Sequence, residues 1–181
     1  MPVSTTKMVL HMKKNTAKKS PSSKSTASLL TNQDVPGGIL PFATTLLVRD
    51  CCLCLHVQRA ARTLARIFDE ALRPFGLTNG QFSLLMSLNR PEPPSMAPVA
   101  SLLAMDRTTL TAALKPLERR GLVKITPDPN DRRSRILTLT MKGKKLLAQA
   151  MPVWQSTHEE IEKLIPAGTP EDLRQNLRAL S

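Results

Sequence analysis

The chain has 181 residues and a formal net charge of +12. Apolar residues make up 41% of it, enough for a core, but aromatic residues are only 3% and there is no tyrosine. This composition argues against a sheet-dominated fold and favours a mainly helical domain. The charge favours a polyanionic partner, and its excess lies in two stretches. Residues 1–34 hold six Lys and one Asp, and residues 105–145 hold eleven Lys or Arg against four acids.

Residues 1–40 are expected to form a disordered basic extension. They are rich in Lys, Ser and Thr and show no hydrophobic periodicity. Two interpretations stay open. The extension adds non-specific phosphate affinity, or it is dispensable, for example an over-extended start with Met8 or Met12 as the alternative first residue.

Residues 41–76 are expected to form a dimerisation helix. From about Thr45 to Arg73 apolar residues recur at helical intervals, and Pro74 with Gly76 ends the pattern. A helix of this length is long for packing inside one small domain. It is therefore expected to pack against a second subunit.

Residues 77–143 predict three helices followed by a β-hairpin. The helices are expected to begin at Thr78 (with Gln81 as capping-box partner), Ser95 and Asp106. Gly121 ends the third helix, and alternating residues predict strands at 122–125 and 136–140 around a turn. Two helices joined by a tight turn, followed by a hairpin with a basic tip, indicate a winged helix-turn-helix, a mainly α fold with a small β-hairpin wing that binds DNA.

Residues 144–181 are expected to supply C-terminal dimerisation helices. One helix is predicted from Met141 toward Ile165 and another from Thr169 to Leu180. The last helix carries an apolar stripe formed by Leu173, Leu177 and Leu180. The dimerisation region is thus expected to draw on both termini.

The helix after Asp106 is predicted to enter the major groove of DNA. Leu110, Leu114 and Leu117 follow helical spacing and are its predicted core face. The other faces present candidate DNA contacts: Arg107, Thr108, Thr109, Thr111, Ala112 and Lys115. Arginine can pair with guanine, threonine hydroxyls can meet base edges or phosphates, and lysine suits phosphate. The wing adds Arg132, Arg133 and Arg135 for the minor groove.

These motifs resemble the MarR family of bacterial transcription regulators. The matching strings are Met105 to Thr111, Leu117 to Val123, the wing run Asp128 to Arg135, Leu137 to Thr140, and Gly143. The resemblance implies a homodimer that binds a palindromic operator in double-stranded DNA as a regulator, in most such proteins a repressor. It also implies that Asp131 holds the wing and that Arg133 enters the minor groove.

The resemblance further implies relief by a small phenolic or aromatic ligand. Such a ligand would bind between the dimerisation helices and the DNA-binding lobe and favour a spacing of the two DNA-contacting helices that no longer fits the operator. Phe42, Phe68 and Trp154 are candidates for lining this crevice, with a plain core role as the alternative.

The cysteines Cys51, Cys52 and Cys54 form a candidate redox sensor with His56. On one continuous helix, Cys51 and Cys54 would share a face, as would Cys52 and His56. The family has a branch that senses organic hydroperoxides, and Cys54 falls at about the position of its reactive cysteine. That branch uses tyrosines, which this chain lacks, so simple packing is the alternative. A zinc site is not expected, because one helical stretch cannot direct four ligands at one ion.

The sequence does not favour an enzyme. It has no paired carboxylates in a cleft pattern, only seven glycines, and isolated histidines at 11, 56 and 158. No cofactor is expected. The broken apolar run at 46–57 argues against secretion and membrane spanning, so a cytoplasmic protein is expected. The rival to a DNA-binding regulator is a winged-helix module that binds a protein without sequence-specific DNA binding.

Overall fold

The computed structural model describes residues 39–131 and 133–180. The predicted extension at 1–40 therefore lies almost wholly outside the described residues, as does Arg132 of the predicted DNA contacts. The chain divides into two units, Met1–Cys52 and Leu53–Ser181, and each is described by itself.

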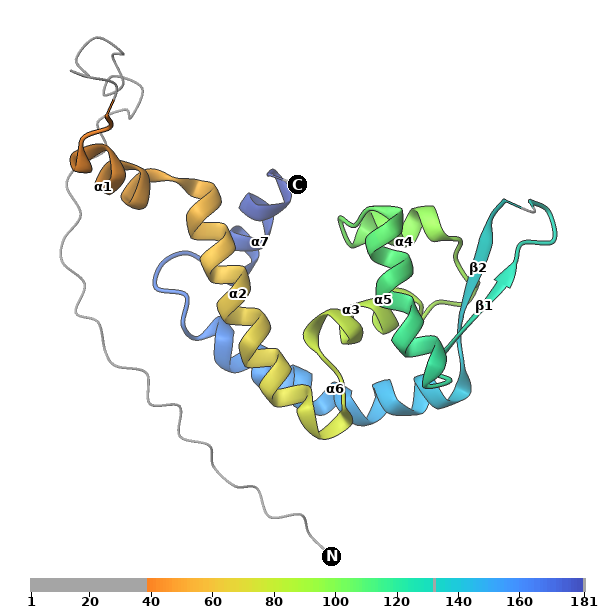
Figure 1. Cartoon of the computed structure of the whole chain (residues 1–181). Helices are drawn as coiled ribbons and strands as arrows, with labels where there is room; N and C mark the ends of the chain where they lie inside the picture. The colour runs from red at the N-terminus through yellow and green to blue at the C-terminus, as the bar shows by residue number, and fades with distance from the viewer. Residues whose placement is uncertain (1–38, 132, 181) are drawn as a thin grey trace, which may run out of the picture. The chain divides into compact units, whose positions relative to one another are not determined.

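In the first unit the described residues form α1 (Phe42–Cys51), which buries no side chain (Figure 1). Cys52 has an extended backbone and its amide donates to the carbonyl oxygen of Val48, which ends the helix. A new helix begins at Leu53. The single helix predicted from Thr45 to Arg73 is therefore wrong. The apolar pattern continues across Cys52. However, α1 buries no side chain, so no core packing holds it in line with the next helix.

The second unit carries the remaining elements in the predicted order (Figure 1). They are α2 (Leu53–Leu72), the 3-10 turn η3 (Arg73–Phe75), α3 (Asn79–Ser87), α4 (Met96–Leu102), α5 (Arg107–Arg119), β1 (Val123–Pro127), β2 (Arg135–Leu139), α6 (Met141–Glu162) and α7 (Pro170–Arg178). The two strands pair antiparallel, with Val123 opposite Leu139. A single bridge from Ser95 to Ile136 adds the residue before α4 to the edge of the hairpin.

The predicted helix starts are confirmed where polar side chains cap them. Thr78 accepts a hydrogen bond from the Gln81 amide at 3.2 Å, and the Gln81 side chain accepts one from the Thr78 amide at 3.3 Å. This reciprocal pair satisfies two amides that the first turn of α3 would leave unpaired. Ser95 precedes α4 as predicted, but its side chain makes no capping bond.

The core of the second unit forms beneath the helix-turn-helix. Leu110, Leu114 and Leu117 are fully buried, which confirms the predicted core face of α5. α2 packs against α3 and α6, and α5 packs against α4 and β1. Phe68 of α2 stacks against Trp154 of α6 with ring centroids 6.1 Å apart. The helix-turn-helix therefore shares one continuous hydrophobic core with α2 and α6.

The last helix is joined to α6 by an ion pair. Arg174 of α7 donates to Glu162 at 2.7 Å, and this bond is the main cause of a lowered pKa of the Glu162 carboxyl. Leu173 and Leu177 remain exposed on α7. Among the described residues, no helix combines the length and apolar composition needed to cross a bilayer.

The wing joins α6 at a crowded junction around Gly143. The Thr140 side chain caps α6 by accepting from the Gly143 amide at 3.1 Å, and its hydroxyl lies 2.8 Å from the Gly121 carbonyl oxygen. A Cβ at position 143 would lie 2.4 Å from the carbonyl oxygen of Leu122 and 2.7 Å from a methyl of Leu139. Only a residue without a side chain lets α6 approach the start of β1 this closely.

The turn between α4 and α5 passes through Ala104, which has a φ of 50°. This left-handed conformation brings Cβ close to the following carbonyl, a strain that glycine avoids. Replacing Ala104 by glycine is expected to raise the free energy of unfolding by about 0.5 kcal/mol, because relief of strain exceeds the added freedom of the unfolded chain. Urea titration measures the change. Ala97→Gly, in the exposed face of α4, is the matched control and is expected to lose about 1 kcal/mol. A loss in both variants would contradict the prediction.

Candidate nucleic-acid interface

The exposed face of α5 presents the six predicted contact residues to solvent. Opposite it, the buried leucines fix the rotation of the helix about its own axis. The exposed residues are Arg107, Thr108, Thr109, Thr111, Ala112 and Lys115. The amphipathic pattern therefore places cations, hydroxyls and small apolar groups together on one surface.

Asp106 caps α5 as predicted. Its carboxylate accepts hydrogen bonds from the Thr109 hydroxyl at 2.6 Å and from the Thr109 amide at 2.8 Å. These bonds, the hydroxyl's first, hold the pKa of the Asp106 carboxyl below its usual value. Because the folded pKa is depressed, the cap is intact at neutral pH and is lost as the pH falls through that lowered value.

Two of the predicted threonine contacts use their hydroxyls within the helix. The Thr109 hydroxyl donates to Asp106, and the Thr111 hydroxyl donates to the carbonyl oxygen of Arg107 at 2.7 Å. In this arrangement the hydroxyl protons are used within the helix, and the methyl groups and the acceptor lone pairs of the oxygens are left for a partner. A thymine methyl is one group they can contact.

The wing tip is held by two carboxylates. Asp128 accepts from the amide of Asn130, and Asp131 accepts from the amide of Arg133, each at 2.9 Å. Such side-chain turns replace backbone hydrogen bonds where the chain reverses. This geometry agrees with the structural role expected for Asp131. Arg133 and Arg135 are exposed beside it.

Arg107 connects α5 to the wing. Its guanidinium donates to the carbonyl oxygen of Arg133 at 3.3 Å. The sequence predicted a base contact for Arg107 and gave no sign of this bond, because its acceptor is a main-chain atom 26 residues away. The arrangement brings the start of α5 and the tip of the wing into one positively charged surface.

Arg120 is a structural residue that the sequence did not single out. It donates to the carbonyl oxygen of Gly76 at 2.7 Å, and its own carbonyl oxygen accepts from Lys142 at 2.7 Å. These bonds fasten the end of α5 to η3 and α6. The acceptors of its side chain are main-chain oxygens 44 and 45 residues away, so no local sequence signal pointed to these bonds.

Comparison with known proteins gives the relationship. The family model described as "MarR family" matches residues 77–134, which hold α3 to the wing tip. The multiple antibiotic resistance protein MarR of Escherichia coli K12 is 31% identical over 103 residues, which cover 56% of this chain and 72% of that protein. The chain belongs to the MarR family. The relatives it matches include proteins named as transcription regulators.

Two solved MarR-family structures resemble this chain over most of their length. The transcriptional regulator MosR of M. tuberculosis, in complex with DNA, is 36% identical with a TM-score of 0.65, covering 71% of this chain and 92% of that one. CouR of Rhodococcus jostii RHA1, bound to p-coumaroyl-CoA, is 25% identical with a TM-score of 0.63, covering 72% and 92%. The winged-helix fold predicted from the sequence is confirmed.

Two other curated regulators match this chain over a smaller share of their own length. BadR of Rhodopseudomonas palustris and NicR of Pseudomonas putida, 34% and 33% identical, are named as an activatory protein and as a repressor. The matches cover 54% and 53% of this chain, which spans 59% and 61% of those proteins' lengths. The family thus includes regulators of both signs.

In this MarR-family chain an apolar hollow of about 360 Å³ lies where α3 faces α6. Trp154 forms part of its lining and stacks against Phe82, with centroids 6.0 Å apart, and against His158 at 4.8 Å. Of the predicted crevice residues, Trp154 lines this hollow and Phe68 is buried behind it in the core. Phe42 belongs to the first unit and is exposed there.

The predicted cysteine pairs do not share a helix. Cys51 and Cys52 belong to the first unit, whereas Cys54 and His56 belong to α2. The face-sharing predicted for Cys51 with Cys54, and for Cys52 with His56, was wrong because the helix breaks at Cys52. Cys54 is exposed, and its sulfur accepts a hydrogen bond from the side-chain amide of Gln58 at 3.2 Å. Within the described part of the chain, no three His, Cys, Asp or Glu residues gather as a metal site would require.

Proposed function

We propose that this MarR-family protein binds a palindromic DNA operator as a homodimer and represses transcription from it. The main support is the hydrogen bond from Arg107 of α5 to the carbonyl oxygen of Arg133 at the wing tip. It puts both proposed DNA-contacting elements on one exposed basic surface. The N-terminal part of α5 enters the major groove, and the wing enters the adjacent minor groove. Asp131 shapes the wing, and Arg133, Arg135 and Arg132 carry its charge.

Exposed apolar side chains support the homodimer. Ile39, Leu40 and Phe42 are 79%, 69% and 73% exposed in the first unit, and Leu173 and Leu180 are exposed near the C-terminus. Side chains of this kind are costly to leave in water, so clusters of them mark association surfaces. Dimerisation through both termini places the two α5 helices in successive major grooves on one face of the duplex, which matches a palindromic site.

Relief of repression is assigned to a small aromatic ligand in the hollow beside Trp154. The stacked rings of Trp154 and Phe82 offer an apolar face to such a ligand. A relative with a bound organic molecule, CouR in complex with p-coumaroyl-CoA, supports this assignment. Release through oxidation of Cys54 stays a second prediction, for which the exposure of this thiol is the support.

Replacing Arg133 by alanine is expected to weaken operator binding by about 1–3 kcal/mol, measured by gel-shift titration. The substitution removes the cation but keeps the carbonyl oxygen that accepts from Arg107, so the wing stays attached to α5. Operator affinity is the quantity that decides the role of this side chain.

Arg66→Ala is the matched control for the loss of one charge. Arg66 is exposed on α2, outside the proposed DNA surface. Its removal should leave operator affinity within about twofold. Equal affinities of the Arg133→Ala and wild-type proteins would remove Arg133 from the interface.

A further inference from the structure

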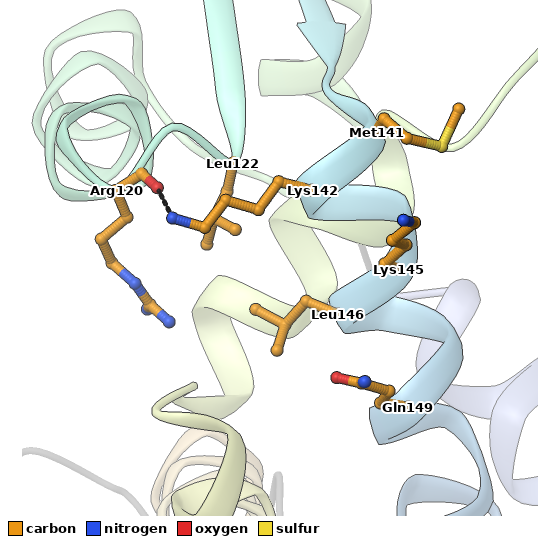
Figure 2. Close-up of a pocket in the computed structure, with 7 residues that line it drawn as sticks. All are labelled: Arg120, Leu122, Met141, Lys142, Lys145, Leu146 and Gln149. Carbon is orange, nitrogen blue, oxygen red and sulfur yellow. Dashed lines mark hydrogen bonds between the residues drawn. The ribbon is translucent and has the colours of Figure 1, made fainter.

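A second hollow, of about 560 Å³, lies where α5 ends, β1 begins and α6 starts (Figure 2). It shares no lining residue with the hollow beside Trp154. It is also built from other residues than the proposed DNA surface. The function proposed above leaves this site unused.

Three cations form the charged part of this hollow: Arg120, Lys142 and Lys145. Arg120 and Lys142 are bonded to backbone carbonyls, which leaves their positive charges unneutralised. Lys145 has no hydrogen bond or ion pair to any described residue, and none of the described residues lining the hollow is acidic. The charge therefore suits an anion.

The apolar part is aliphatic. Leu122, Met141 and Leu146 supply it, and Leu122 and Leu146 face the same space as the Arg120 side chain in Figure 2. None of the described lining residues is aromatic, in contrast to the hollow beside Trp154. Leu122 is already buried, so Met141 and Leu146 are the side chains that a bare inorganic anion would leave in water and that an aliphatic chain would cover.

We propose that this hollow binds an amphipathic carboxylate with an aliphatic chain, and that such a ligand acts as an effector. The carboxylate lies among Arg120, Lys142 and Lys145, and the aliphatic chain lies against Met141 and Leu146. Arginine can bind a carboxylate through two parallel N–H donors. The guanidinium of Arg120 has five N–H donors, and only some of them bond to the carbonyl oxygens of Gly76 and Phe75.

The same cations fasten α5 to its support. Lys142 holds the Arg120 carbonyl oxygen, and Arg120 holds the Gly76 carbonyl oxygen, each at 2.7 Å. A carboxylate competes with these carbonyls for the cations and so loosens the end of α5. The ligand then favours a protein with altered α5 placement over the DNA-bound one, and affinity for DNA falls. This last step rests on the proposed function; binding of the ligand does not.

Isothermal titration of the full chain with octanoate, without DNA, tests binding directly. Octanoate should bind, and the neutral octanamide, with the same chain, should bind at least about tenfold more weakly. Lys145→Met should weaken octanoate binding about tenfold, because it removes one charge-assisted contact without disturbing a bond in the fold. Lys144→Met, on the same helix but outside the hollow, should bind octanoate as the wild type does. No heat of binding, or equal affinities for octanoate and octanamide or for the two variants, would overturn the proposal.

The protein's one tryptophan separates the two hollows. Trp154 lines the other hollow, so octanoate bound beside Lys145 should leave Trp154 emission unchanged at saturation. If octanoate quenched Trp154 emission with the same dissociation constant that calorimetry gives, octanoate would bind beside Trp154 and the proposed site would be wrong.

Gel shifts then test the effector role. Octanoate should release DNA from the wild type and release it about tenfold less readily from Lys145→Met, in step with the weaker binding. If octanoate released DNA equally well from the wild type and from Lys145→Met, the effector role would be wrong. Failure to bind any DNA would overturn the proposed function and leave the binding site standing.

Discussion

Replacing Gly143 by alanine is expected to lower the free energy of unfolding by about 3 kcal/mol. The new Cβ would lie 2.4 Å from the carbonyl oxygen of Leu122, a main-chain atom that cannot rotate away. To make room, α6 must move off the start of β1, which would disturb the Thr140 cap and the buried side chain of Leu139. Urea denaturation followed by circular dichroism measures the loss.

Gly80→Ala is the control for replacing a glycine as such. A Cβ at position 80, in the first turn of α3, meets nothing within 4 Å. That variant is expected to gain about 0.5 kcal/mol, because alanine restricts the unfolded chain and favours the helix. If Gly143→Ala were as stable as the wild type, the close approach of α6 to β1 would be wrong.

Operator affinity is expected to fall about 10³-fold between roughly 50 and 200 mM salt. Each protomer of the proposed dimer offers several exposed cations on α5 and the wing, among them Arg107, Lys115 and Arg133. About six neutralised phosphates, three per protomer, release enough counterions to give a salt dependence of this size. Fluorescence anisotropy with a labelled duplex, repeated across the salt series, measures it.

The salt series also separates the two function classes. A winged-helix module that binds only a protein would show weak DNA binding without a preferred sequence. A scrambled duplex, run beside the operator, gives the non-specific part at every salt concentration. The Arg133→Ala protein should show a shallower slope, since position 133 then neutralises no phosphate. A slope close to zero for the wild type would exclude phosphate contacts as a source of its affinity.

Short-range rules predicted much of the fold and the outline of the site. The spacing of Leu110, Leu114 and Leu117 identified which face of α5 is buried, and the Asp106 cap identified where the helix starts, because both depend on neighbours within a few residues. The exposed positions of α5 follow from the same pattern.

What the sequence could not predict involves main-chain partners far along the chain. The bonds from Arg107 to the wing and from Arg120 to η3 and Gly76 all end on carbonyl oxygens, which every residue type provides equally. The break at Cys52 was missed for a different reason. Apolar periodicity indicates which residues avoid water, and it continues across Cys52 although the backbone there is extended and α1 buries no side chain.

The acceptor that joins Arg107 to the wing is a backbone atom of residue 133, and its side chain takes no part in that bond. Any amino acid at this position keeps the carbonyl oxygen in place. The bond that attaches the wing to α5 therefore does not depend on which side chain stands at position 133. The side chain at position 133 can therefore change, by drift or by protein engineering, while the hydrogen bond from Arg107 and the turns held by Asp128 and Asp131 are kept.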